Sequence, residues 1–587
     1  MSATPSPDAL DRAEPEPDAG SIGPADSRRS GLALRAEGAQ RPGPAPSGPP
    51  RRWIEYLALE TRRATAVYWG AVGLVAAALF VPRLLPMADY PQHLGMAAIA
   101  RRLTDSASPL HAGFELDYFT YNGLFHWLTA ALGRALPVEL AGRLVVSLAI
   151  VGLAAGALVL LRTLERPPAY AALLVPGLFS LALSWGFVNH ALGVALGTFA
   201  LVAVARAAQR PSVAAFVITA GLGLVIAFAH VLAMLLLCAL ATALALELAW
   251  RTAGATGATA RRRALGALGR AAAALAPLGA GALHCVAVYR HQYRWDPGSY
   301  QDPVLEGTMP PLWKKLALFP TNVNGVHADF TDAVLAGGAV ALLVAIAWRA
   351  RRDRRAGIAP AGSRAPVLPL LVAGALYFAV PTVWIGTHVI YPRLAQLVLL
   401  TAIVAAPRVA SPARFERLAL ALAVVAGVNL CAHAWAFARE TDAASRVVDR
   451  LPPGRNVTAV VHDTGTFSFR THSLLHLAAY YVARNEGEYA FNFARYASLP
   501  LGFRAGSQPA WPLRGWEFAP LDYDPRCGYA RYYDVVLVVA PVGQEDASEA
   551  AIRRLVFRED AERPRLLARE GRFWGFDTAG LPANANP

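Results

Sequence analysis

The sequence predicts an α-helical polytopic membrane protein of about eleven transmembrane helices, followed by a small C-terminal extracytoplasmic α/β domain. Hydrophobic residues make up 55% of the 587 residues, whereas charged residues make up only 16%. Soluble domains carry about 25% charged residues. Apolar runs of about 20 residues, each long enough to cross a bilayer, recur through the first three quarters of the chain. The last quarter has a soluble composition.

The first 65 residues are rich in Pro, Ala, Gly, Ser and charged residues, for example PSPDALDRAEPEPDAG. Such a segment buries too little apolar surface to fold. Because an apolar run follows it rather than precedes it, we expect residues 1–65 to be a disordered cytoplasmic tail ahead of a signal anchor.

Residues 66–438 hold the predicted transmembrane domain. Two long apolar stretches are interrupted, near Asn189 and near His230, and each is therefore counted as a pair of spans. The predicted spans are 66–86, 139–161, the pair within 169–207, the pair within 213–250, and then about 265–288, 333–348, 366–385, 390–407 and 415–437.

Charge bias gives the orientation, because cytoplasmic flanks of membrane helices are enriched in Lys and Arg. The net charge is +14, and the arginines form short clusters between apolar runs, such as RARRDRR at 349–355. That distribution indicates topology rather than nucleic-acid binding. With the N-terminus inside, these clusters fall on the cytoplasmic side. The long loops 87–138 and 289–332 and the domain 439–587 fall outside. The Arg- and Ala-rich composition favours a bacterial inner membrane.

The C-terminal domain shows alternating strand and helix patterns. NVTAVVHD, YDVVLVVAP and FWGFDT are typical of strands, whereas HSLLHLAAYYVAR and SEAAIRRLVF are typical of helices. We find no catalytic motif in this domain, and we interpret its tryptophans and tyrosines as core residues.

Ionisable residues at membrane depth are costly and are candidates for function. In this topology one set falls on the outer side. It comprises Asp89, His93, His190, His230, His388 and Arg393. Each alone is explained as an interfacial or core-satisfied residue; their common side suggests one outward-facing cavity.

Asp89 is the first carboxylate after the first span, in MADYPQHLGM. A carboxylate there can accept a proton from an attacking hydroxyl or bind a divalent metal through oxygen. The i, i+4 spacing places His93 on the same helix face. Zinc-ligand spacing is absent from the sequence, so Mg²⁺ or Mn²⁺ shared between Asp89 and a substrate phosphate is the expected ion, if any.

A resemblance to a family rests on short motifs. An acidic residue follows the first span, DYFTYNGLFHW precedes the second, and Glu139-Leu140-Ala141-Gly142-Arg143-Leu144 opens it. This order resembles the GT-C superfamily of integral-membrane glycosyltransferases, in particular its protein O-mannosyltransferase and aminoarabinose transferase branch. Many members carry paired acids after the first span. Here Asp89 lies between Ala88 and Tyr90, so a second acid must come from elsewhere, and Glu115 and Asp117 are candidates.

The resemblance implies hexosyl or pentosyl transfer on the outer face, from a polyprenyl-phosphate-linked sugar in the membrane lipid to a lipid, glycan or protein acceptor. Asp89 would serve as base or metal ligand, with the outer histidines binding substrate. Arg393, Lys314 and Lys315 would hold phosphate. Two alternatives stay open: a lipid or solute transporter of this architecture, and a non-catalytic member that lost one acid.

Overall fold

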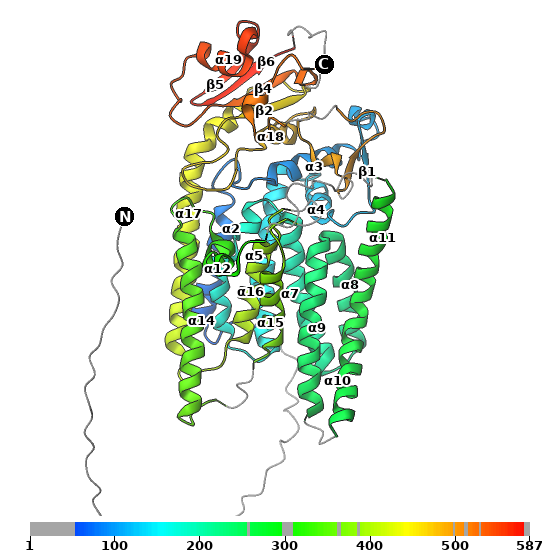
Figure 1. Ribbon diagram of the computed structural model, residues 1–587, viewed down its shortest axis with the longest axis vertical. Coiled ribbons are helices and arrows are strands. Elements are labelled where there is room, and N and C mark those ends of the chain that lie inside the picture. The colour runs from blue at the N-terminus through cyan, green and yellow to red at the C-terminus, as the bar shows by residue number, and fades with distance from the viewer. Residues whose placement is uncertain are drawn as a thin grey trace, which may run out of the picture. The chain divides into compact units, whose positions relative to one another are not determined.

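The computed structural model describes residues 53–254, 259–295, 309–360, 365–383, 388–496, 499–509, 515–527 and 530–579. All of them belong to one compact unit, Arg52–Pro587. In this unit a bundle of long helices carries, at one end, a cap of short helices and a small β-sheet (Figure 1). Most of the predicted tail, residues 1–52, lies outside the described residues, whereas α1 (Trp53–Tyr56) and the start of α2 (Arg62–Ala78) fall within its last part.

The bundle helices overlap the predicted spans, although their ends differ from the predicted bounds. After α2 they are α5 (Val138–Thr163), η2 (Pro168–Gly177) with α6 (Leu181–Ser184), α7 (Val188–Gln209), α8 (Val213–Ala229), α9 (Val231–Gly254), α10 (Ala260–Leu275) continued by η3 (Ala276–Leu278) and α11 (Gly279–Trp295), α14 (Thr331–Arg355), α15 (Leu368–Ala379), α16 (Ile390–Ala405) and α17 (Ala413–Asp449).

Six of the described helical segments are long and apolar enough to cross a membrane. They are Val138–Thr163, Val188–Gln209, Val231–Gly254, Ala260–His291, Thr331–Arg355 and Ala413–Asp449. Four more apolar segments of 10–17 residues are shorter. Large apolar side chains such as Leu283, Val334 and Leu371 are well exposed on the bundle, as expected of surfaces that face lipid. The chain is therefore a helical membrane protein, while the number of eleven spans stays a prediction.

The interrupted runs break for identifiable reasons. At His230 the backbone turns extended, which ends α8 and lets α9 begin at Val231. The earlier run contains Pro176 and is wound as a 3₁₀ helix, η2, before a short turn of α-helix. Gly186 (φ +93°) then lets the chain turn into α7.

The first predicted outer loop, 87–138, contributes several elements to the cap. Its main element, α3 (Tyr90–Arg102), is buried from Tyr90 to Ala100. It is followed by η1 (Pro109–Ala112), β1 (Phe114–Leu116) and α4 (Leu124–Leu132). The second outer loop contributes α12 (Leu312–Ala317) and α13 (Phe319–Asn324).

The C-terminal segment forms a four-stranded mixed sheet in the order β2-β4-β6-β5. The strands are β2 (Val457–Val461), β4 (Val535–Val539), β5 (Arg565–Glu570) and β6 (Phe573–Asp577), and β2 pairs parallel to β4 with Val457 opposite Val535. The β-branched runs predicted as strands thus become β2 and β4. The helices α18 (Leu477–Arg484) and α19 (Glu549–Phe557) lie within the segments predicted as helical.

The remaining short elements are β3 (Leu501–Phe503), which pairs with β1, and η4 (Phe493–Arg495), η5 (Pro520–Asp522), η6 (Ala530–Tyr532) and η7 (Arg558–Asp560).

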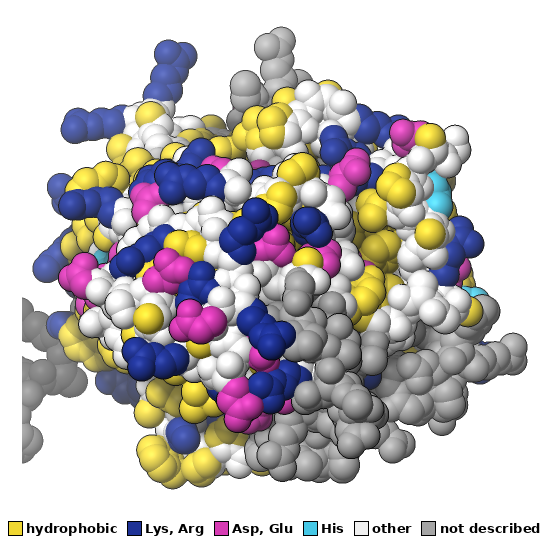
Figure 2. Space-filling view, turned by 90° about the horizontal axis from the view of Figure 1, so that it is seen from above, with side chains coloured by type: hydrophobic (Ala, Val, Ile, Leu, Met, Phe, Trp, Pro, Cys, Tyr) yellow, Lys and Arg dark blue, Asp and Glu magenta, His cyan; other side chains and the backbone are white. Residues whose placement is uncertain are grey.

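The C-terminal segment is packed onto the first outer loop rather than set apart from the bundle. The α18 helix lies against α3, and one apolar core runs from the bundle through both. A smaller core that includes Trp516 and Trp574 lies around the sheet, which agrees with the interpretation of these aromatics as core. Seen from above, this end displays acidic and basic side chains intermixed (Figure 2), in contrast with the apolar flanks of the bundle.

Candidate active site

Asp89 occupies the N-cap of α3, where the bundle meets the cap. Its backbone N–H donates to the Trp185 carbonyl at 3.0 Å, so the turn before α7 holds it. Gly186 makes this approach possible: a Cβ there would lie 2.5 Å from the Tyr90 nitrogen. Sequence-distant segments therefore fix the position of this carboxylate.

The side chain that contacts the Asp89 carboxylate is His476, 387 residues away. His476 Nε2 lies 3.2 Å from Asp89 Oδ1, and its Nδ1 lies 3.2 Å from Glu517 Oε1. The imidazole is 4% exposed, whereas the side chains of Asp89 and Glu517 are 19% and 16% exposed. One buried imidazole thus joins two partly accessible carboxylates, from the first outer loop and from the C-terminal segment.

Gln92 fixes the ring of His476. Its amide nitrogen lies 3.0 Å from His476 Nδ1 and donates to the Phe491 carbonyl at 2.9 Å, while its amide oxygen accepts from the Phe493 nitrogen at 3.3 Å. These two backbone partners therefore fix which amide atom of Gln92 is the nitrogen and which is the oxygen. Nδ1 faces an amide donor and a carboxylate together, so it can either accept from Gln92 or donate to Glu517.

Electrostatics favour protons on this group. Burial would lower the pKa of His476, but the hydrogen bond to Asp89 and the negative charges of Glu517 and Asp89 raise it above 6.5. Burial also raises the pKa of Glu517, and although the charge of His476 opposes this, Asp89 adds to it. Shifted pKa values on adjoining groups are frequent at functional sites.

Three of the predicted histidines lie in two pairs, His93 with His126 and His190 with His230. His93 Nδ1 lies 3.0 Å from His126 Nε2, rather than bonding to Asp89. Burial lowers the pKa of His93 to about 4, so this ring is neutral at pH 7. His190 and His230 lie with their ring centroids 5.2 Å apart. His230 is within electrostatic range of His93, His190 and Arg393.

Arg393 is buried at the start of α16, within range of electrostatic interaction with Asp89. Its guanidinium donates to the carbonyls of His388 (2.7 Å) and Val389 (3.2 Å) and lies over the Phe187 ring. The side chain of His388 is exposed. The structure therefore brings together Asp89, His93, His190, His230 and Arg393, with His388 at the edge.

The two lysines lie in different surroundings. Lys315 is fully buried, and its ammonium donates to the carbonyls of Tyr377, Phe378 and Val380 at the end of α15. It would have to leave these carbonyls to hold a phosphate. Lys314 is exposed, on a helix whose Trp313 and Leu316 are also exposed. Such a helix suits the membrane–water interface.

The second-acid candidates also lie elsewhere. Glu115 is exposed on β1, opposite Gly502 of β3. Asp117 accepts from the Phe119 nitrogen at 2.7 Å. The acid that joins Asp89 through His476 is Glu517, which the sequence analysis missed. The only cue to His476 in the sequence is that it precedes an apolar helical pattern. Glu517 has no such cue, because it lies in a segment without a motif.

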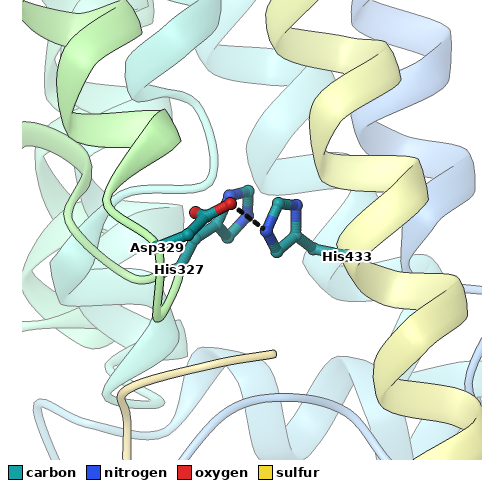
Figure 3. A group of neighbouring side chains, drawn as sticks. All are labelled: His327, Asp329 and His433. Atoms are coloured by element: carbon teal, nitrogen blue, oxygen red, sulfur yellow. Dashed lines mark hydrogen bonds and ion pairs between the residues drawn. The ribbon is translucent and has the colours of Figure 1, made fainter. Parts of the chain in front are cut away.

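The donors around Asp89 suit Mg²⁺ poorly. This ion requires an octahedral, oxygen-rich shell, whereas an imidazole separates Asp89 from Glu517. Among the described residues, His327, Asp329 and His433 place possible ligand atoms within 4.8 Å of one another (Figure 3). The rings of His327 and His433 are stacked, with centroids 3.7 Å apart and 11° between their planes, so as placed they cannot bind one metal ion. Mg²⁺ or Mn²⁺ at Asp89 stays a prediction.

Comparisons with known proteins leave the family open. No family model matches the chain, and no curated protein matches it. Among solved structures, it is similar to ArnT from Cupriavidus metallidurans in the apo state, with a TM-score of 0.46 and 14% identity over 89% of this chain and 99% of that chain. Fold and site define a helical membrane protein in which one buried imidazole joins two carboxylates at one end of the bundle.

Proposed function

We propose that the protein is a membrane glycosyltransferase of the GT-C type, which moves a hexosyl or pentosyl group from a polyprenyl-phosphate donor to a lipid, glycan or protein acceptor. The observation that carries the proposal is the Asp89–His476–Glu517 chain, with Arg393 close by, at the junction between an apolar bundle and a polar cap. A lipid-linked sugar needs such a junction, because its tail requires lipid and its sugar requires polar partners.

Asp89 serves as the general base in this proposal. The hydrogen bond between Asp89 and His476 is made at Oδ1, and we assign Oδ2 to the acceptor. The acceptor hydroxyl oxygen attacks the anomeric carbon while its proton passes to Asp89 Oδ2. The bond between the anomeric carbon and the phosphate oxygen breaks, and its electron pair leaves with the polyprenyl phosphate. General-base catalysis of this kind contributes about 10²- to 10⁴-fold.

The cations have separate roles. His476 orients Asp89 and, when doubly protonated, keeps it ionised and ready to accept a proton. The leaving phosphate acquires negative charge as the bond breaks, and Arg393 supplies a buried positive charge to meet it. The neutral ring of His93 and the pair His190 and His230 offer hydrogen bonds to sugar hydroxyls. Lys314 supplies a further phosphate contact at the interface.

The membrane side follows from charge. The arginine cluster at the end of α14 (Arg349–Arg355) and the predicted tail face the cytoplasm, whereas the cap faces outward. We propose that the protein resides in a bacterial inner membrane with its site on the extracytoplasmic face.

Release of polyprenyl phosphate tests the proposal. Purified protein in micelles is given a radiolabelled polyprenyl-phosphate sugar and an envelope lipid extract as acceptor. Wild type is expected to release free polyprenyl phosphate and to label an acceptor. A transporter or a non-catalytic relative would bind the donor intact, and intact donor after prolonged incubation with extracts that support a known transferase would contradict the proposal.

A further inference from the structure

A groove of about 400 Å³ lies away from the Asp89 centre, where the ends of α2, α5 and α17 meet α18. Its charged lining comprises Arg83, Glu139, Arg143, Asp449 and Arg484, and its apolar lining includes Phe80, Val81 and Leu140. In the topology predicted from charge bias, α2 ends and α5 begins at the outer face. The groove therefore lies at the outer boundary between membrane and water.

An apolar track leads from the groove along α5. Leu140 lines the groove, and Leu144, Leu148 and Val151 follow it at helical spacing on the same face. These three side chains are exposed, as is Phe80 in the groove itself. Exposed apolar faces of a membrane helix contact lipid chains. The groove is therefore continuous with a surface that suits the acyl chain of an outer-leaflet lipid.

The two carboxylates of the groove are already shared between two of its arginines. Arg484 contacts Glu139 at 2.6 Å and Asp449 at 2.9 Å. Arg83 donates from one guanidinium nitrogen to Asp449 at 3.3 Å, and its side chain is 54% exposed. Arg83 therefore presents an accessible guanidinium to a ligand in the groove.

Arg143 brings a further positive charge into the wall of the groove. Its side chain is buried, and its guanidinium donates to the backbone carbonyls of Leu79, Pro82 and Arg83 rather than to a carboxylate. Carbonyls satisfy its N–H groups but carry no net charge to neutralise it, whereas buried charges in proteins are usually paired. An anion in the groove would supply the missing negative charge.

We propose that this groove binds the headgroup of an anionic outer-leaflet phospholipid of the phosphatidylglycerol type. Three arginines against two carboxylates give the lining one surplus positive charge, and the single negative charge of such a lipid neutralises it. The phosphate lies against Arg83 and near Arg143, the glycerol hydroxyls donate to Glu139 or Asp449, and an acyl chain follows the exposed face of α5. A zwitterionic lipid leaves the surplus charge in place. Basic pockets between membrane helices favour anionic headgroups for the same reason.

A lipid bound here braces the cap on the bundle. Arg484 is the last residue of α18, whose N-cap is His476. Its ion pairs connect α18 to Glu139 in the first turn of α5 and to Asp449 at the end of α17. A headgroup on these side chains adds a contact at the same junction. The inference stands apart from the proposed function, because the lipid is bound rather than consumed and its contacts are not those of the Asp89 centre.

Selective retention of lipid by the full chain is the test. Delipidated protein in micelles is incubated with equal amounts of phosphatidylglycerol and phosphatidylcholine that have identical acyl chains, and bound lipid is counted by native mass spectrometry. We expect one retained phosphatidylglycerol per chain, with a preference of about tenfold that weakens as salt is added. Phosphatidylglycerol is also expected to raise the thermal unfolding midpoint.

Arg83→Gln is the main variant, because this exposed change removes one charge of the groove while Arg484 keeps both carboxylates paired. The preference for phosphatidylglycerol should fall about fivefold. Arg134→Gln removes an exposed arginine that does not line the groove and serves as the matched control, with the preference unchanged.

Equal retention of the two lipids by wild type would indicate a non-selective lipid shell and would overturn the proposal. An unchanged preference in Arg83→Gln, or an equal loss in Arg134→Gln, would also overturn it. Asp89→Asn separates the two proposals, since it is expected to abolish sugar transfer while retaining the lipid preference.

Discussion

Glu488 is the buried acid whose titration is easiest to isolate. It is 7% exposed, one carboxylate oxygen accepts from Tyr532, and the other has no hydrogen-bond partner among the described residues. Burial raises its pKa from 4.5 to about 7. A group whose pKa is higher in the folded state adds stability that is fully present below 4.5 and is lost as the pH rises through 7.

The size of this effect follows from the shift. Each pKa unit corresponds to about 1.4 kcal/mol, so the change from 4.5 to about 7 amounts to about 3.5 kcal/mol over the whole range. Most of that loss, roughly 2.5 kcal/mol, falls between pH 5 and pH 8. Glu488→Gln removes the titration and keeps the shape. The glutamine amide does not titrate, so its effect on the free energy of unfolding is the same at pH 5 and pH 8. It therefore cancels when the stabilities of the variant at the two pH values are subtracted.

The assay is denaturant unfolding of the full chain in micelles, followed by tryptophan fluorescence at pH 5 and pH 8. Wild type should lose about 2 to 3 kcal/mol more unfolding free energy than Glu488→Gln over this interval. Equal losses in the two proteins would show that Glu488 ionises in the folded state as it does in water, and would refute the account of its burial.

Three further substitutions test the site and its supports. His476→Phe keeps the ring and removes the charge-assisted bond to the proposed base, which is worth about 1.5 to 3 kcal/mol; kcat should fall roughly 10- to 100-fold with KM little changed, and an unchanged kcat would exclude the role. Gly186→Ala forces a Cβ to 2.5 Å from a backbone nitrogen of α3, so the unfolding midpoint and transfer should both fall, whereas Gly221→Ala, with open space around it, should leave both unchanged. Lys315→Met leaves the carbonyls of Tyr377, Phe378 and Val380 without their donor and should cost about 1 to 3 kcal/mol, against less than about 0.5 for the exposed Lys314→Met. Equal thermal shifts in the two variants would contradict the role of Lys315 in stabilising the end of α15.

Local patterns predicted most of the fold. The apolar runs gave the bundle helices, and the break at His230 falls where α8 ends. The Val-rich runs at 457–461 and 535–539 gave strands, because β-branched residues favour a pleated, buried surface. The 3₁₀ winding of η2, which contains Pro176, was not predicted, since an apolar run does not distinguish helix types.

The site was predicted in part. Asp89 and the outer histidines follow from membrane depth and charge bias, which are properties of single segments. The contact of Asp89 with His476 spans 387 residues, and no periodicity connects them. The i, i+4 spacing suggested His93 as its partner, but the packing of α4 on α3 gives that ring to His126. Tertiary packing decides such contacts, so a single sequence leaves them open.

The role of Asp89 is the central claim, and transfer by Asp89→Asn tests it most directly. The rate of polyprenyl phosphate release is compared among wild type, Asp89→Asn, Glu517→Gln and the control Glu115→Gln, with micelle-bound folding checked by the unfolding midpoint. The account predicts at least a 100-fold loss for Asp89→Asn, a smaller loss with a shifted pH profile for Glu517→Gln, and no change for Glu115→Gln. Wild-type release by a folded Asp89→Asn protein would contradict it.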